Sequence, residues 1–169
     1  PALLAIAPGD LVALDVLRVS GRRAQRWDLV VGACERLAEL LKAPARVAAS
    51  REEAGVVCVE SLGDGARAER NLRAALQVQP ERPVAYARLR EVLEGRRDTA
   101  GLEALVASRI PHVEDAAERA GMHWEQARLR RALGLREGAL VDEPCLPHPP
   151  QDPVPPRHRA SQVQGRVEA

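Results

Sequence analysis

Four histidines are the side chains in this sequence best suited to proton transfer or metal binding near neutral pH. They are His112, His123, His148 and His158. None lies four residues from another within a predicted helix, the spacing that puts two metal ligands on one helix face. His123 stands beside Trp124 and Glu125, but the pattern favours a partly exposed helix residue next to a packing tryptophan. The histidines therefore predict neither a metal site nor a cofactor.

Carboxylates are numerous, but they alternate with arginines at helical spacing, as in Glu69, Arg70 and Arg73. Acid–base catalysis needs two carboxyl groups held in a cleft with shifted pKa values. Opposite charges three or four residues apart are instead typical of solvated helix faces. The sequence also lacks a phosphate loop and the GxGxxG, HExxH and GxSxG motifs. We therefore predict that the protein is not an enzyme and has no catalytic residues.

The densest basic group could bind phosphates. It consists of Arg128, Arg130, Arg131 and Arg136. Aromatic side chains that would stack on single-stranded bases are missing nearby, apart from Trp124. An exposed helix face with local glutamate partners is the favoured interpretation. The formal net charge of only +1 gives no reason to expect nucleic-acid or membrane binding.

The three cysteines, Cys34, Cys58 and Cys145, are odd in number and widely spaced. Their spacing fits neither a disulfide framework nor a CxxC metal site, so we expect reduced and mostly buried thiols. Such thiols weakly favour a reducing compartment, and we predict a cytoplasmic location. Residues 1–7 are apolar, but they are too short to span a bilayer and lack the basic start of a signal peptide. The first residue is Pro rather than Met, which leaves room for a missing upstream segment.

Composition predicts an all-α fold. Hydrophobic residues make up 46% of the 169 residues, whereas aromatics make up only 2%, so the core must consist of Ala, Leu and Val. Ala, Leu, Arg and Glu favour helix, and the β-branched and aromatic enrichment of sheets is missing.

Apolar residues recur at helical spacing through residues 1–143 and predict about seven helices with a partial eighth. The first follows Asp10 and ends at Gly21, and the others cover approximately 29–41, 45–61, 65–79, 83–95, 99–110, 113–133 and 135–141. Pro44 is expected to stop the second helix. Gly63 suits a left-handed helix end, and Asp64 and Asp98 suit N-caps. Pro83 suits a helix start.

Residues 144–169 are predicted to form a disordered, Pro-rich tail. Seven prolines fall between Pro144 and Pro156, and no helix tolerates that density. Residues 147–150 and 153–156 could serve as extended ligands for SH3-like domains. A linker, or a truncated or out-of-frame end, fits equally well.

The middle of the chain resembles tetratricopeptide repeats, in which antiparallel helix pairs follow a loose pattern of large and small residues. Residues 62–69 are similar to the turn and second-helix start of such a unit. Ala68, Leu72, Ala75 and Pro80 then fall at the second-helix and closing positions, and Tyr86, Leu89 and Leu93 at positions of the next first helix. Small residues such as Ala68 and Ala75 also have a physical role, because closely crossing helices need them. The first-helix position that is usually Gly or Ala is assigned to Val56 and Arg90.

The resemblance implies that residues 1–143 form an α-solenoid of antiparallel helix pairs. In the family, the first helices of successive units line a groove that holds a peptide or a partner helix. The resemblance therefore implies a protein–protein interaction scaffold, with groove residues Arg82, Tyr86, Leu89, Arg90 and Leu93.

Two other functions remain open. The chain could be a helical accessory domain of a larger enzyme or signalling protein, or less favourably an RNA-binding helical repeat. The identity of the partner and the oligomeric state do not follow from the sequence.

Overall fold

A computed structural model describes residues 10–134. In this range the chain forms seven α-helices joined by short connections and contains no β-strand, which confirms the predicted all-α fold. The helices are α2 (Leu11–Arg23), α3 (Trp27–Leu40), α4 (Pro44–Val57), α5 (Gly65–Val78), α6 (Pro83–Gly95), α7 (Thr99–Arg109) and α8 (Ala116–Ala132). A π-helical turn η1 (Cys58–Leu62) extends α4, and a 3-10 turn η2 (Ile110–His112) extends α7. The predicted partial helix over 135–141 and the predicted tail over 144–169 lie outside the described residues.

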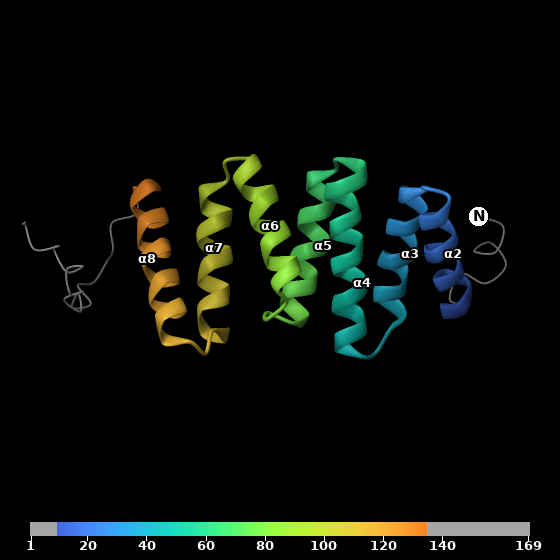
Figure 1. The fold of residues 1–169 in the computed structure, drawn as a ribbon, viewed down its shortest axis with the longest axis horizontal. Coiled ribbons are helices and arrows are strands. Elements are labelled where there is room, and N and C mark those ends of the chain that lie inside the picture. Colours follow the sequence, from blue (N-terminus) through green and yellow to red (C-terminus); the bar gives the residue numbers. More distant parts are fainter. Residues whose placement is uncertain (1–9, 135–169) are drawn as a thin grey trace, which may run out of the picture. The chain divides into compact units, whose positions relative to one another are not determined.

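Each helix packs against the next one along the chain, and α4 also contacts α6. Figure 1 shows the helices side by side in chain order, from α2 in blue to α8 in orange. The connections alternate between the two ends of the helices, so consecutive helices run in opposite directions. Short connections explain this order, because a helix that follows a short connection can reach only the helix that precedes it in the sequence.

Two predicted helix ends are wrong. Gly21 does not end the first helix, because α2 continues to Arg23 and Gly21 is buried within it. A Cβ atom on Gly21 would lie 3.1 Å from Cγ2 of Val30, so this glycine gives α3 room to approach. Pro44 does not stop the second helix. It starts α4, because the first turn of a helix does not need the N–H that proline lacks.

The turn between α4 and α5 has the predicted geometry. Gly63 adopts a left-handed φ of 65°, and the Asp64 carboxylate accepts a hydrogen bond from the Arg67 backbone N–H at 2.9 Å. A similar turn precedes α7, where Arg97 has a φ of 55° and Asp98 caps the helix. Arg97 is not a glycine, and the sequence patterns did not predict its left-handed conformation.

The close contact between α4 and α5 occurs one residue from its predicted position. A Cβ atom on Gly55 would lie 2.5 Å from Cγ of Leu72, so only glycine fits there. Val56, which was assigned to this position, is only partly buried. Ala68 and Ala75 on α5 are fully buried, which agrees with the expected need for small residues at this crossing.

The core lies between the helices and consists mainly of Leu, Val and Ala, as expected from composition. Cys34 and Cys58 are buried free thiols, which confirms the prediction for these two, while Cys145 lies outside the described residues. Trp124 is 60% exposed, so its predicted packing role is wrong. The reason is that α8 contributes no buried residue.

Candidate functional site

The structure separates the five predicted groove residues. Leu93 is fully buried in the core, and Leu89 is 1% exposed. Leu93 therefore lies in the core, whereas Leu89 also lines the cavity described below. The other three, Arg82, Tyr86 and Arg90, are partly exposed. Arg82 is the N-cap of α6, and the other two lie within this helix.

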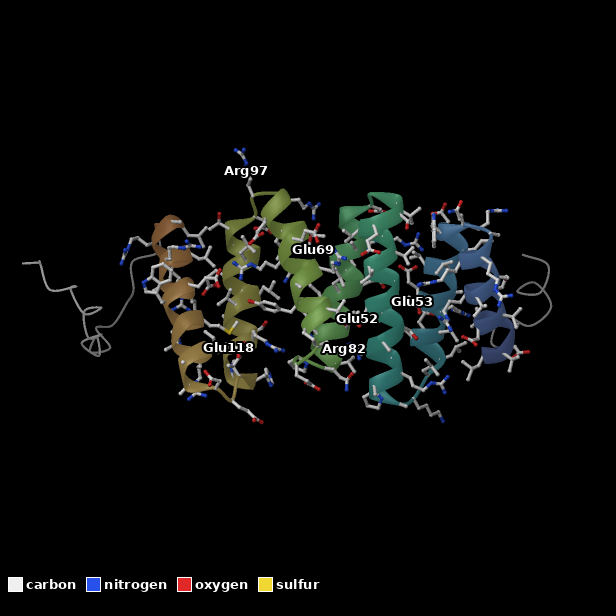
Figure 2. The ribbon with its side chains drawn as sticks, viewed as in Figure 1. Glu52, Glu53, Glu69, Arg82, Arg97 and Glu118 are labelled. Atoms are coloured by element: carbon white, nitrogen blue, oxygen red, sulfur yellow. The ribbon has the colours of Figure 1, made fainter. Side chains whose placement is uncertain are left out.

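Arg82 connects α4 to α6. Its guanidinium donates from Nε and Nη2 to the Glu52 carboxylate, at 3.0 and 2.8 Å. Glu52 also accepts a hydrogen bond from the Ala85 backbone N–H at 3.0 Å, one of the N–H groups at a helix start that has no partner within the helix. Figure 2 shows Glu52 and Arg82 close together between the two helices. These hydrogen bonds show that Arg82 helps to hold the start of α6 against α4.

Arg90 makes the corresponding connection from α6 to α8. It donates to Glu125 on α8 and, at 2.8 Å, to Glu94 on its own helix. These hydrogen bonds raise the pKa of Arg90 above its ordinary value. Arg18 of α2 forms a similar pair with Glu53 of α4 at 3.0 Å. Ion pairs therefore join α2 to α4, α4 to α6 and α6 to α8.

A partly buried polar network joins α3, α4 and α5. Arg67 donates to both oxygens of Glu35, at 3.0 and 2.6 Å. Asn71 is 2% exposed, donates to Glu35 at 2.7 Å, and accepts from Arg51 at 3.1 Å. The hydrogen bond from Arg67 is the main reason that the pKa of Glu35 is lowered. Because all members are hydrogen-bonded, this network holds three helices in register.

One ion pair occurs twice at a fixed interval. Glu69 of α5 pairs with Arg96, and Glu103 of α7 pairs with Arg130 of α8. The two glutamates are separated by the same number of residues as Gly63 and Arg97 are, and so are the two arginines. In both pairs the glutamate lies on one helix and the arginine lies at or near the end of the next. The basic group predicted around Arg130 thus has a glutamate partner at this position.

A half-open cavity of about 330 Å³ lies between α5, α6 and α7. Apolar side chains form its walls, and polar and basic side chains surround its opening. The lining residues are Arg73, Leu76, Gln77, Pro80, Tyr86, Leu89, Ala104, Leu105, Ser108, Arg109 and His112. No carboxylate belongs to this set. Two of the predicted groove residues, Tyr86 and Leu89, therefore border the cavity, whereas Arg82, Arg90 and Leu93 do not.

Arg109 is held at the cavity by contacts other than an ion pair. Its Nη1 donates to the Pro80 carbonyl at 2.6 Å, and its guanidinium lies 5.7 Å from the centre of the Tyr86 ring. Within residues 10–134, no carboxylate forms an ion pair with it. The Tyr86 hydroxyl is buried without a hydrogen-bond partner in the same range, and burial raises its pKa.

Other chemistry-bearing side chains in the described range are poorly placed for catalysis. Burial raises the pKa of Cys34 to about 12 and of Cys58 to about 11, so both thiols are protonated at neutral pH. His123 is exposed, and the neighbouring Glu125 is engaged by Arg90. Across residues 10–134, no cluster of three or more His, Cys, Asp or Glu side chains could hold a metal ion. No helix in this part combines the length and apolar character needed to cross a bilayer.

The basic side chains of the cavity, Arg73, Arg109 and His112, were not predicted as site residues. One signal for Arg109 does exist in the sequence, because it follows Ala75 by the same interval that separates Gly63 from Arg97. Ala75 is small and fully buried, and it allows a close crossing of α5. The equivalent position in the next helix pair is Arg109, which has a long cationic side chain.

Comparisons with models of known families, with curated proteins and with solved structures found no match. The functional argument therefore rests on the geometry of the described residues.

Proposed function

We propose that the chain is a tetratricopeptide-like stack of helical hairpins that binds a segment of a partner protein on its surface. The observation that carries this proposal is that α2, α4, α6 and α8 are joined side chain to side chain by ion pairs. Helices that alternate in the chain thus contribute to one continuous surface. Stacked repeats use such surfaces for binding.

A recurring interval supports the repeat. The left-handed residues Gly63 and Arg97 are separated by the same interval as Glu69 and Glu103, whose ion pairs correspond. This interval matches the tetratricopeptide period of about 34 residues.

The π-helical turn η1 accounts for an irregularity in the repeat. The Asp64 backbone N–H donates to the carbonyl of Cys58, six residues earlier. In the equivalent turn before α7, the Asp98 backbone N–H donates to the carbonyl of Leu93, five residues earlier. One extra residue in the segment from α4 to η1 thus explains why the helix pairs differ in length.

The charged side chains of this surface can exchange partners at low cost. The Arg90 side chain is 36% exposed, and exposed ion pairs contribute only about 0–1 kcal/mol to stability. An acidic group of a partner can therefore replace Glu94 or Glu125 around this guanidinium without unfolding the helices.

A matched pair of variants tests the proposal. The full chain is screened against a peptide array, and bound peptides are remeasured with Arg90→Gln and Arg36→Gln. Arg36 lies on α3, and it pairs with Glu39 of the same helix at 2.8 Å. Among the described residues it takes no part in the ion pairs between alternating helices. We expect Arg90→Gln to weaken binding several-fold and Arg36→Gln to leave it unchanged.

Equal effects of the two variants would remove the α6–α8 surface from the proposal. Failure of the wild-type chain to bind any peptide would reject the binding function itself. Circular dichroism of both variants provides the folding control.

One observation favours the accessory-domain alternative. Val12, Val16 and Val19 form an apolar stripe on α2 and are 71%, 51% and 39% exposed. Such a stripe suits packing against a further helix of a longer protein. Hydrogen exchange of α2 in the product of the complete reading frame tests this alternative, because the added helix would slow exchange there. Identical exchange in the long and short proteins would reject it.

A further inference from the structure

We propose that the cavity between α5, α6 and α7 binds a partner segment in which an acidic side chain neighbours a bulky aliphatic one. This inference rests on the proposed partner-binding function and specifies the chemistry of the partner. The cavity adds a second contact site for that partner beside the ion-paired surface of the alternating helices, because neither Arg82 nor Arg90 lines it.

The cavity exists because of a specific difference between two neighbouring helix pairs. In α5, Ala75 is fully buried and lets the helices close on one another. Arg109 occupies the equivalent position of α7, one repeat interval later, and its guanidinium instead extends over the Tyr86 ring to the Pro80 carbonyl. The long side chain of Arg109 thus lines an opening at this position. In the preceding helix pair, the small Ala75 leaves no such opening.

The charges at the cavity favour a carboxylate ligand. Arg73 and Arg109 line it together with His112, and no acidic residue does. Arg73 pairs with Glu69 at 2.9 Å, but the same carboxylate also pairs with Arg96. The Glu69 carboxylate is therefore shared by two guanidiniums. Within the described residues, Arg109 forms no ion pair with a carboxylate. Guanidinium groups with unused N–H donors bind carboxylates through short, charge-assisted hydrogen bonds.

The walls of the cavity favour an aliphatic neighbour of that carboxylate. Leu76, Leu89 and Leu105 line it, and the volume of about 330 Å³ lies at the small end of ligand pockets. It suits one or two side chains of a bound segment. Ser108 and Gln77 are lining residues that solvent reaches, and their polar groups can bond to the backbone of that segment.

The probe is a peptide with alternating Leu and Glu that has both ends blocked and carries an uncharged boron-dipyrromethene dye, so that side-chain carboxylates are its only acidic groups. A peptide with Gln in place of Glu is the neutral control. Binding to the full chain is measured by fluorescence anisotropy at low salt. We expect the Glu peptide to bind at least about tenfold more tightly, the loss expected when a charge-assisted hydrogen bond is removed.

Substitutions of Ser108 test the location of the site. This residue is exposed at the cavity on α7, and its hydroxyl bonds only to the Leu105 carbonyl of its own helix, so changes there leave the core intact. Ser108→Glu supplies a carboxylate from the chain itself and should weaken binding by about tenfold. Ser108→Gln adds almost the same volume without charge and should leave the affinity within about threefold.

Equal binding of the Glu and Gln peptides would overturn the inference, as would a Ser108→Glu variant that binds like wild type. If binding resists Ser108→Glu but is lost in Arg90→Gln, the proposed function stands and the cavity is not its site. If no peptide of any kind binds, both proposals fail. A free aliphatic carboxylate that binds as tightly as the peptide would assign the cavity to a small molecule and overturn the choice of a partner segment.

Discussion

Replacement of Arg97 by glycine should stabilise the protein. Arg97 has a φ of 55°, a region in which an L side chain is strained against its own backbone. Its side chain is exposed, and Figure 2 shows it pointing away from the ribbon at the turn between α6 and α7. Glycine already occupies the equivalent place in the turn between α4 and α5, at Gly63. The substitution therefore relieves strain and removes no contact between helices.

The expected gain follows from two opposing effects. A left-handed conformation costs a non-glycine residue about 1–2 kcal/mol, and glycine removes that cost. Glycine also makes the unfolded chain more flexible, which costs about 0.5–1 kcal/mol. The net stabilisation lies between about 0 and 1.5 kcal/mol, with a midpoint of about 0.75 kcal/mol, which corresponds to about 1.5–3 °C in melting temperature for a domain of this size.

Thermal and urea unfolding of the full chain, followed by circular dichroism, measures the change. Gly63→Ala should lower stability, because it places a side chain in the same left-handed conformation. Ala87→Gly in the middle of α6 should cost about 1 kcal/mol, because glycine weakens a helix. If Arg97→Gly destabilises the protein as Ala87→Gly does, the turn is not strained and the equivalence of the two turns is wrong.

Three further substitutions probe the core and its polar contacts. Tyr86→Phe should raise stability by about 1 kcal/mol, because it removes a buried hydroxyl without a partner; a lower urea midpoint would show that the hydroxyl is hydrogen-bonded. Gly55→Ala should cost about 1–3 kcal/mol in urea unfolding, because its Cβ would meet Leu72 at 2.5 Å, and an unchanged midpoint would contradict the close contact. Arg67 lowers the pKa of Glu35 below its ordinary 4.5, so the ionised carboxylate stabilises the fold above that pH, and this stabilisation is lost as pH falls through the lowered value. Glu35→Gln should therefore be less stable than wild type at pH 7, with a difference that shrinks below about pH 4.5; a difference independent of pH would count against the network.

The candidate cavity could be found only in part from the sequence. Tyr86 and Leu89 were singled out by resemblance, and both border it. Arg73 and Arg109 were missed, because on their own helices they look like ordinary members of a charged, solvated face. Their proximity depends on how α5 and α7 pack around α6, and helical spacing within one segment does not contain that information.

Residues close together in the sequence set most of the helix ends. These features depend on neighbours within one turn: Asp64 and Asp98 cap the following helix, Pro83 starts one, and Gly63 ends one. Contacts between helices, in contrast, set which side of each helix is covered. An α-helix turns about 100° per residue, so a shift of one position exchanges a buried residue for a partly exposed one, as with Gly55 and Val56. The burial of the predicted groove leucines, the ion pairs between alternating helices and the basic cavity all arise from such contacts, and for that reason the sequence patterns did not reveal them.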